Sequence, residues 1–171
     1  MRLSDLFEIK NGIASSNVII SDFKTEDYTI PYFRPSSSWN NLVAGYIDKK
    51  EIDNKHIYPT NTLFVSTDGE GSHTYSYVSP FDFIPNSNVE VLIPKRKMEL
   101  TEKMFYAMII TKNRFRFSYG RKPKGERLAS LEIPEKVFNW VKKIEFTNYE
   151  KGITEKENNQ NIRLTNTENW K

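Results

Sequence analysis

One stretch near the middle of the chain constrains the fold most, because it is a series of short strand-like runs separated by turns. Residues 61–66 (NTLFVS) and 74–78 (TYSYV) flank the Gly-containing turn 67–73. Residues 81–84 and 88–93 add further strand-like runs. Short runs of β-branched and aromatic residues, bounded by Gly, Asn, Asp and Ser, predict strands joined by tight turns. The series therefore predicts a domain built around antiparallel sheet.

Two later segments have the apolar spacing of helices. Residues 99–111 (ELTEKMFYAMIIT) predict a largely buried helix. After Pro134, residues 135–144 predict a second helix, whose apolar stripe consists of Val137, Trp140, Val141 and Ile144. Shorter strand-like runs precede both, at 30–33, 45–47 and 51–52.

These elements predict an α+β fold, a single compact domain of many short, mainly antiparallel strands with two or three helices. The length of 171 residues suits one domain with its own core. Beyond Phe146 the sequence becomes polar and poor in apolar residues. We therefore expect a domain over residues 1–146 and a polar linker or mobile C-terminal tail over residues 147–171.

Composition argues against most enzyme classes. The chain has no Cys and only two His, so we expect no metal site, no Cys nucleophile and no disulfide. It lacks a nucleophile elbow, a P-loop and a dinucleotide fingerprint, so we also expect no cofactor and no catalysis. Asp68 and Glu70 could bind a cation, although a solvated turn suits them better. Without a signal peptide or a membrane-length apolar run, we expect a soluble cytoplasmic protein that does not bind membranes.

Charge is distributed unevenly along the chain. Residues 95–127 hold 11 Lys and Arg against three acids, whereas the remainder holds 14 Lys and Arg against 19 acids. A basic face on an otherwise acidic body favours nucleic acid as the partner. This interpretation requires that the cations of the second half of the chain gather into one concave patch.

The most basic part of this segment is residues 114–128, RFRFSYGRKPKGERL. Alternation of Arg and Phe over 114–119 predicts a strand that turns Phe115 and Phe117 towards the core. The Gly and Pro residues that follow predict a basic loop over 119–127.

Three other loops offer residue types that bind phosphates or base edges: 34–41, 71–74 and 86–88. Together with the basic loop they favour a duplex DNA-binding surface. Two alternatives stay open at this point. The chain could instead be a protein-interaction module, or it could bind single-stranded RNA on exposed aromatic side chains.

Several motifs follow one another in a characteristic order: LFEIKNG at 6–12, IPY at 30–32 before a Ser/Asn loop, LFVS at 63–66, and RFSYGRK at 116–122. This ordered set, within roughly residues 3–145, resembles a target recognition domain of the specificity subunits of type I restriction–modification systems. It is also similar to the related domain of type IIG enzymes. A protein-interaction module or inhibitor that acts on a restriction–modification complex stays open as the alternative.

The resemblance implies a protein without catalysis of its own, which reads one half of a bipartite double-stranded DNA target. It implies a DNA adenine methyltransferase (modification) subunit as partner, and it allows a restriction/motor subunit as well. The resemblance further implies that one DNA groove is lined by Arg34, Ser36, Ser38, Asn41, Ser72, His73, Thr74, Tyr119, Arg121, Lys122, Lys124 and Arg127.

The chain differs from a complete specificity subunit in two respects. Such a subunit has two recognition domains joined by long helical spacers, whereas one domain is predicted here. Residues 147–171 also show no sustained heptads. We expect a half-subunit that pairs with a second copy or with another recognition domain, a truncated gene product, or an excised domain.

Overall fold

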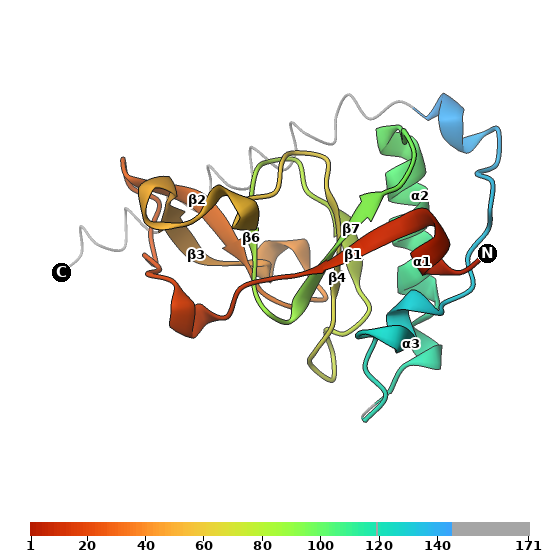
Figure 1. Ribbon diagram of the computed structural model, residues 1–171, viewed down its shortest axis with the longest axis horizontal. Helices are drawn as coiled ribbons and strands as arrows, with labels where there is room; N and C mark the ends of the chain where they lie inside the picture. Colours follow the sequence, from red (N-terminus) through yellow and green to blue (C-terminus); the bar gives the residue numbers. More distant parts are fainter. Residues whose placement is uncertain (119, 145–171) are drawn as a thin grey trace.

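The computed structural model describes residues 1–118 and 120–144 and contains two sheets and one long helix (Figure 1). The α-helices and strands of these residues are α1 (Leu3–Leu6), β1 (Phe7–Asn11), β2 (Tyr28–Phe33), β3 (Val43–Asp48), β4 (Leu63–Ser66), β5 (Ser76–Val78), β6 (Ile84–Pro85), β7 (Val89–Pro94), α2 (Leu100–Lys112) and α3 (Glu126–Ala129). The predicted α+β class is confirmed. The predicted domain boundary at residue 146 and the tail 147–171 lie outside the described residues.

The strands form two sheets. The larger sheet has four strands in the order β1-β7-β4-β5, and all its neighbours are antiparallel. The hairpin predicted over 61–78 is its β4–β5 pair, in which Leu63 lies opposite Val78. The smaller sheet has the order β3-β2-β6, and its β2–β6 pair is parallel, with Phe33 opposite Pro85.

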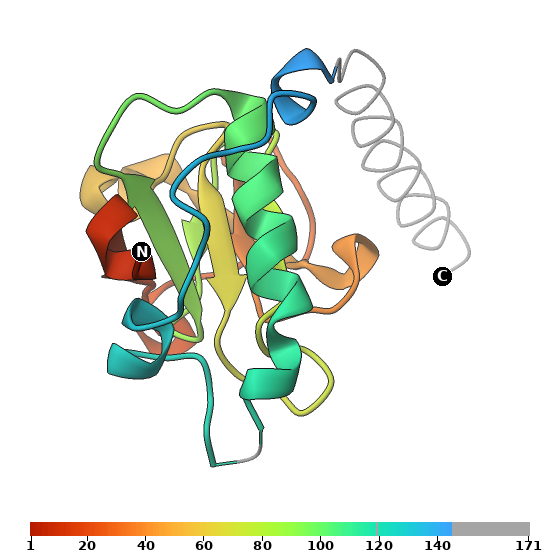
Figure 2. The ribbon, with the colours of Figure 1, turned by 90° about the vertical axis from the view of Figure 1, so that its right-hand side faces the viewer.

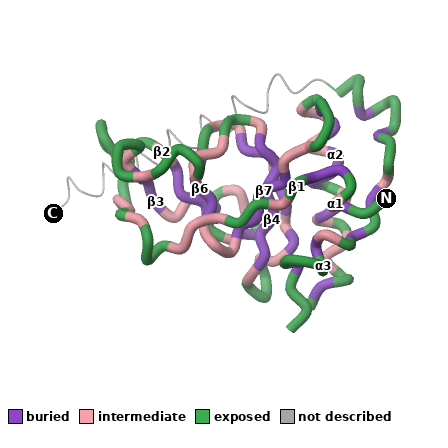
Figure 3. Tube along the Cα trace, viewed as in Figure 1, coloured by how far each residue is buried: buried purple, intermediate pink, exposed green. Residues whose placement is uncertain are grey.

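β4 is buried along its whole length because both faces of the larger sheet are covered (Figure 3). Leu63 and Val65 belong to the core that α2 shares with the sheet. Phe64, which points the opposite way, belongs to an aromatic cluster that joins this sheet to β2 and the β6 region. In that cluster the rings of Phe33 and Phe83 stack with centroids 4.5 Å apart. The layers are therefore helix, sheet, aromatic cluster and second sheet.

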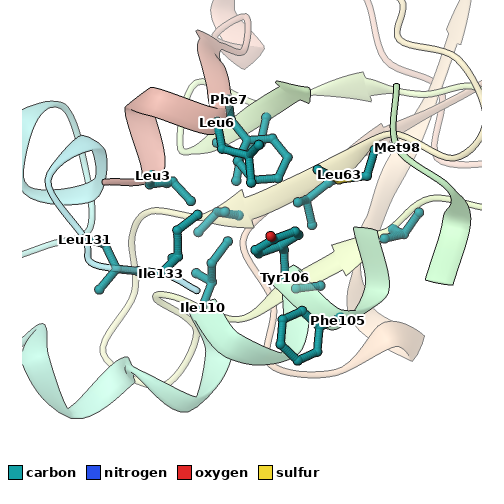
Figure 4. Close-up of a cluster of buried hydrophobic side chains, with 14 of the residues drawn as sticks. Leu3, Leu6, Phe7, Leu63, Met98, Phe105, Tyr106, Ile110, Leu131 and Ile133 are labelled. Atoms are coloured by element: carbon teal, nitrogen blue, oxygen red, sulfur yellow. The ribbon is translucent and has the colours of Figure 1, made fainter. Parts of the chain in front are cut away.

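α2 confirms the helix predicted over 99–111 and covers one face of the larger sheet (Figure 2). Its inward side chains include Tyr106 and Ile110, which lie among Leu3, Phe7 and Leu63 (Figure 4). The rings of Phe7 and Tyr106 meet edge to face with centroids 5.5 Å apart. This contact connects the first strand to the centre of α2.

The prediction of a strand over 114–119 is wrong for residues 114–118, because Arg114–Arg116 is a 3₁₀ helix. Residue 119 lies outside the described part of the chain. The Asn113 N–H and side-chain amide both bond the Ile109 carbonyl, which turns the chain at the end of α2. Phe117 is buried as expected, but Phe115 points into solvent and is 80% exposed. Tertiary anchoring of the turn therefore overrides the Arg/Phe alternation.

The helix predicted over 135–144 is also wrong, since only Val141–Lys143 is helical and that turn is 3₁₀. The Tyr106 hydroxyl donates to the carbonyls of Pro134 and Glu135, at 3.0 and 3.4 Å. These carbonyls would otherwise begin the hydrogen-bond ladder of a helix. Earlier in the chain, the short strand predicted at 51–52 is replaced by a 3₁₀ turn that follows β3.

Candidate nucleic-acid interface

The four loops with DNA-binding residue types meet at one end of the molecule. β4 ends at Ser66, which lies opposite Val89, the first residue of its antiparallel neighbour β7. The loop that follows Ser66 and the loop that precedes Val89 therefore leave the sheet side by side. β2 and β6 are parallel, so the loops that follow Phe33 and Pro85 also leave in the same direction. Sheet topology therefore brings together loops that are far apart in the sequence.

Hydrogen bonds join these loops to one another. The Ser36 N–H donates to Ser66 Oγ at 3.1 Å, and the Thr67 N–H donates to the Asn88 carbonyl at 2.8 Å. Lys124 Nζ lies 3.4 Å from the Ser87 carbonyl. We call residues 34–41, 67–75, 86–88 and 118–127 the loop cluster; its residue 119 lies outside the described part of the chain.

The hairpin turn 67–75 is fixed to the end of α2 by Arg114. The Nε atom of Arg114 donates to the His73 carbonyl at 2.8 Å, and its guanidinium lies over the Tyr75 ring, 4.2 Å from the centroid. The adjacent Thr74 is fully buried and has a φ of 71°, which is a strained conformation for a β-branched residue. The second half of the turn is therefore anchored, whereas its tip at residues 69–71 is exposed.

The surroundings of His73 favour its neutral form. Burial lowers its pKa, and the positive charges of Arg114 and Lys122 lower it further. Its Nδ1 lies 2.8 Å from Thr74 Oγ1. A neutral imidazole held in this way can offer its other ring nitrogen to a ligand without adding charge.

The basic loop 118–127 begins with a tight turn and ends in α3. Ser118 and Arg121 exchange two backbone hydrogen bonds, of 2.8 and 3.3 Å, around Gly120, whose φ is 77°. Gly125 precedes α3 with φ 57° and ψ −132°, a conformation that essentially only glycine adopts. The glycines of this segment therefore set the path of its backbone.

A buried carboxylate lies beneath this loop. Glu90 of β7 is 1% exposed, and its carboxylate accepts a hydrogen bond from the Gly125 N–H. Burial raises the Glu90 pKa, while the Gly125 N–H and the charge of Lys124 act in the opposite direction. Glu90 Oε2 and the buried Thr67 Oγ1 have no hydrogen-bond partner among the described residues. Glu90 therefore connects the basic loop to the central sheet.

The structure places the predicted DNA-contacting residues in three groups. Those exposed in the loop cluster are Arg34, Asn41, Arg121, Lys122, Lys124 and Arg127. Ser38, Ser72 and His73 are half-buried. Ser36 and Thr74 are buried, and their hydroxyl groups make internal contacts, Ser36 Oγ donating to the Ser38 carbonyl at 2.6 Å. Tyr119 lies outside the described residues.

Several exposed cations have partners within the cluster. Lys122 Nζ pairs with the Asp68 carboxylate, and that bond lowers the Asp68 pKa. Arg127 donates to the Gly120 carbonyl at 3.1 Å, and Arg34 to the Asn41 carbonyl at 2.8 Å. Such contacts orient the side chains without neutralising most of their charge.

The basic segment does not form one patch, so that expectation is wrong. α2, about 20 Å long, separates two groups of cations. Near its N-terminal end, Lys95 donates to the Ser4 carbonyl at 2.6 Å and Arg96 pairs with Glu102 at 2.9 Å. Near its C-terminal end a depression of about 210 Å³ is lined by Arg116, Phe117, Arg121, Arg127, Ser130 and Leu131. The first group is concave as well, because Lys95 and Arg96 line a pocket of about 620 Å³, but Asp5, Glu102 and Glu135 line the same pocket. Only the second group is joined to the loop cluster, so the nucleic-acid interpretation rests on that group alone.

Sequence reasoning missed three residues that shape this surface. Arg114 is an internal anchor, Phe115 is a surface residue, and Glu90 supports the basic loop from below. Their contacts join segments far apart in the sequence, such as Arg114 with His73. These roles therefore have no local signal in the sequence.

Two further observations concern other kinds of site. Within residues 1–118 and 120–144, no group of three His, Asp or Glu side chains is arranged to hold a metal ion. In the same part of the chain, no helix has the length and apolar character needed to cross a membrane.

Comparison with known families adds independent information. The family model described as the type I restriction modification DNA specificity domain matches residues 1–134. No curated protein matches the chain.

Solved structures share the fold at low sequence identity. A type I restriction-modification S subunit from M. genitalium has a TM-score of 0.53 and 11% identity, over 77% of this chain and 32% of its own. The HsdS subunit from Thermoanaerobacter tengcongensis has a TM-score of 0.57 and 13% identity, over 98% of this chain and 39% of the HsdS chain. A third structure, from work on the complex assembly and conformational transition of the type I R-M system, has a TM-score of 0.59 and 14% identity. The match covers 98% of this chain and 41% of the solved chain. This chain thus spans about a third to two-fifths of each solved chain.

Proposed function

Because this chain belongs to the type I restriction modification DNA specificity domain family, we propose that it reads a specific sequence of duplex DNA through the loop cluster. The family resemblance inferred from the sequence motifs is confirmed. Catalysis is assigned to other subunits, in keeping with the absence of enzyme motifs from the sequence.

The convergence of four separate loops on one basic end of the molecule carries this proposal. Arg116, Arg121, Lys124 and Arg127 are all exposed there, and Arg116, Arg121 and Arg127 border one depression. Phosphates bind Arg and Lys side chains and backbone N–H groups, whereas base edges bind Arg, Asn and other side chains that can donate or accept. The loop cluster supplies both kinds of group on a support fixed by the sheet.

The two kinds of contact are assigned to different parts of the cluster. The basic loop holds the backbone through Arg121, Lys124 and Arg127, with Lys122 available when it leaves Asp68. Arg34, Ser38, Asn41, Ser72 and His73 are the candidates for base edges. Ser36 and Thr74 act indirectly, because their hydroxyl groups support the turns that carry Ser38 and His73.

The chain is proposed to read one half of a bipartite site and to direct partner subunits to it. Those partners are a DNA adenine methyltransferase subunit and, in the full complex, a restriction/motor subunit. A second recognition domain would read the other half.

Selection from a random duplex library tests the proposal directly. We expect repeated rounds with the full chain to enrich one short sequence. The affinity for that duplex should fall with salt, with a log–log slope of about −4 to −5 for about five phosphate contacts. Equal binding to all duplexes, or preferential binding to single-stranded RNA in competition, would contradict it.

Methylome sequencing provides the matching test in cells. Comparison of cells with and without this gene should show the loss of one adenine-methylation motif. That motif should contain the selected sequence as one half. Unchanged methylation, together with failed selection, would leave no support for a role in DNA recognition.

A second candidate role is docking of a protein partner, and one observation favours it. The rings of Phe138 and Trp140 are exposed and stacked, with centroids 6.4 Å apart. Trp140 also borders an apolar pocket against Met104, Phe105 and Met108 of α2. Exposed apolar patches of this kind mark interaction sites. Replacing Trp140 by Ser should weaken association with a methyltransferase subunit and leave DNA affinity unchanged.

A further inference from the structure

Phe115 has an unusual place on the surface of this protein. It is 80% exposed, which is more than any other large apolar side chain of the described residues. Leaving a whole Phe ring in water forgoes the stabilisation that burial would give. Its neighbour Phe117 is buried, so the same short segment places one ring inside and one outside.

The outward position of Phe115 is fixed by its neighbours in the chain. Arg114 is held against His73 and Tyr75, and Phe117 is packed in the core. In the 3₁₀ turn between these two anchors, the side chain of Phe115 points away from the body of the protein. The guanidinium of Arg116 lies over the exposed ring, 5.6 Å from its centroid. Phe115 is therefore presented by two anchored neighbours and not by a loose loop.

The charge around Phe115 selects the kind of ligand. Arg116 and Arg121 border the depression on this side of the molecule. A ligand that covers Phe115 must therefore offer a flat apolar surface together with negative charge. A nucleotide does both, because every base has a π-face and each is attached to a phosphate. The exposed Trp140 differs, since the pocket that it borders is lined by apolar side chains apart from Thr101 and by no charged residue.

We propose that Phe115 is a DNA-contacting residue that packs its ring against a base of the bound duplex, while Arg116 contacts the adjoining phosphate. This inference rests on the proposed function and extends it from charged contacts to an apolar one. Aromatic side chains beside cations make such contacts when a base is partly unstacked or its edge is open in a groove.

The test uses the full chain and the duplex enriched by the wild-type protein. Phe115→Ala should weaken binding about tenfold, within the range of base–aromatic stacking. The salt slope should stay unchanged, because no charge is removed. Ile19→Ala is the matched control, since Ile19 is 62% exposed and lies outside the loop cluster. Because Phe115 is exposed, both variants should keep the wild-type melting temperature.

A fluorescent base analogue locates the contact. 2-Aminopurine placed at successive positions of the selected duplex should brighten at one position when wild-type protein binds, and not with Phe115→Ala. Unchanged affinity in Phe115→Ala would overturn the inference while leaving the proposed function intact. Weakened association with a methyltransferase subunit, at unchanged DNA affinity, would also overturn it and assign Phe115 to a protein interface. Failure of wild-type protein to bind any duplex would instead reject the proposed function.

Discussion

The two ends of α2 carry similar numbers of cations but use them differently. At the N-terminal end, Lys95, Arg96 and Lys103 all bond within the protein, to the Ser4 carbonyl, Glu102 and the Asn61 carbonyl. At the C-terminal end, Arg114, Lys122, Lys124 and Arg127 also bond within the protein. The difference lies in Arg116 and Arg121, for whose guanidinium groups the described residues include no hydrogen-bond or ion-pair partner. Formal charge in the sequence is therefore a poor guide to charge that a ligand can use.

The difference follows from what surrounds each group. The N-terminal cations lie beside chain segments that expose carbonyls, and beside Glu102, whose side chain is only 9% exposed. Lys103 is half-buried, and this burial lowers its pKa. The C-terminal cations lie on a loop that projects from the sheet.

Neutralising the projecting cations should have the largest effect. We expect Arg116→Gln, Arg121→Gln and Lys124→Gln together to weaken DNA binding about a hundredfold at about 0.1 M salt, and to flatten the salt slope by about 2.7. Fluorescence anisotropy over a range of salt concentrations measures both quantities.

The opposite end of α2 supplies the matched control. Lys95, Lys136 and Lys142 line one pocket there, so their triple replacement by Gln removes the same charge from a single place. We expect an affinity within about threefold of wild type, from the loss of net charge alone. Equal losses in the two triple variants would remove the distinction between the two ends.

Gly125→Ala should have the second largest effect. A Cβ atom at φ 57° and ψ −132° is strained, and the N–H bond to Glu90 would be disturbed. We expect a loss of about 1–3 kcal/mol in the free energy of unfolding and about tenfold in DNA affinity. Gly71→Ala is the control, because Gly71 has open space around it and no positive φ. Denaturant titration and anisotropy of both variants would show whether the conformation of the basic loop matters.

Asp68→Asn should change binding in the opposite direction. The substitution removes a negative charge from the loop cluster and releases Lys122, while the Asn side chain can still accept from the Gly69 N–H. We expect DNA to bind about threefold more tightly, with a salt slope steeper by about 0.9. Weaker binding would show that the Asp68–Lys122 pair is needed to shape the surface.

The smallest effect concerns Glu90 and the pH dependence of stability. Because the Glu90 pKa is raised in the folded protein, folding favours the protonated form. The stabilisation is fully present below the unfolded-state pKa and is lost as pH rises through the folded-state pKa. Glu90→Gln removes this dependence and should keep an acceptor for the Gly125 N–H. We therefore expect the variant to gain stability relative to wild type as pH rises.

Denaturant titration of both proteins at about pH 5 and about pH 8 measures that difference. Other titrating groups cancel in the comparison, because they are common to the two proteins. A constant difference between the two pH values would show that Glu90 keeps the same charge in the folded and unfolded states.

Much of the fold was predictable because its signals are local. The apolar run of β4 and the buried pattern of α2 depend on neighbouring residues, and both elements were found. The strand predicted at 114–119 failed because Asn113 turns the chain and Arg114 is anchored on His73. The helix predicted at 135–144 failed because Tyr106 bonds the carbonyls at its start.

The candidate site was predictable in its loops but not in its individual contacts. Residue type identified the four loops, and sheet topology brought them together. No sequence pattern indicates that Lys122 pairs with Asp68, 54 positions earlier, or that Ser36 and Thr74 turn inward. Such contacts depend on the distances between loops, which exist only in the folded chain.

Many of the hydrogen bonds that hold the loops have a main-chain carbonyl as acceptor. The side chains of Arg114, Lys124 and Tyr77 donate to the carbonyls of His73, Ser87 and Ser37, respectively. Every amino acid provides that acceptor. Mutation can therefore exchange the side chains at His73, Ser87 or Ser37 without removing the attachment. An evolving lineage could acquire new target sequences by altering these positions one at a time while the scaffold beneath them persists.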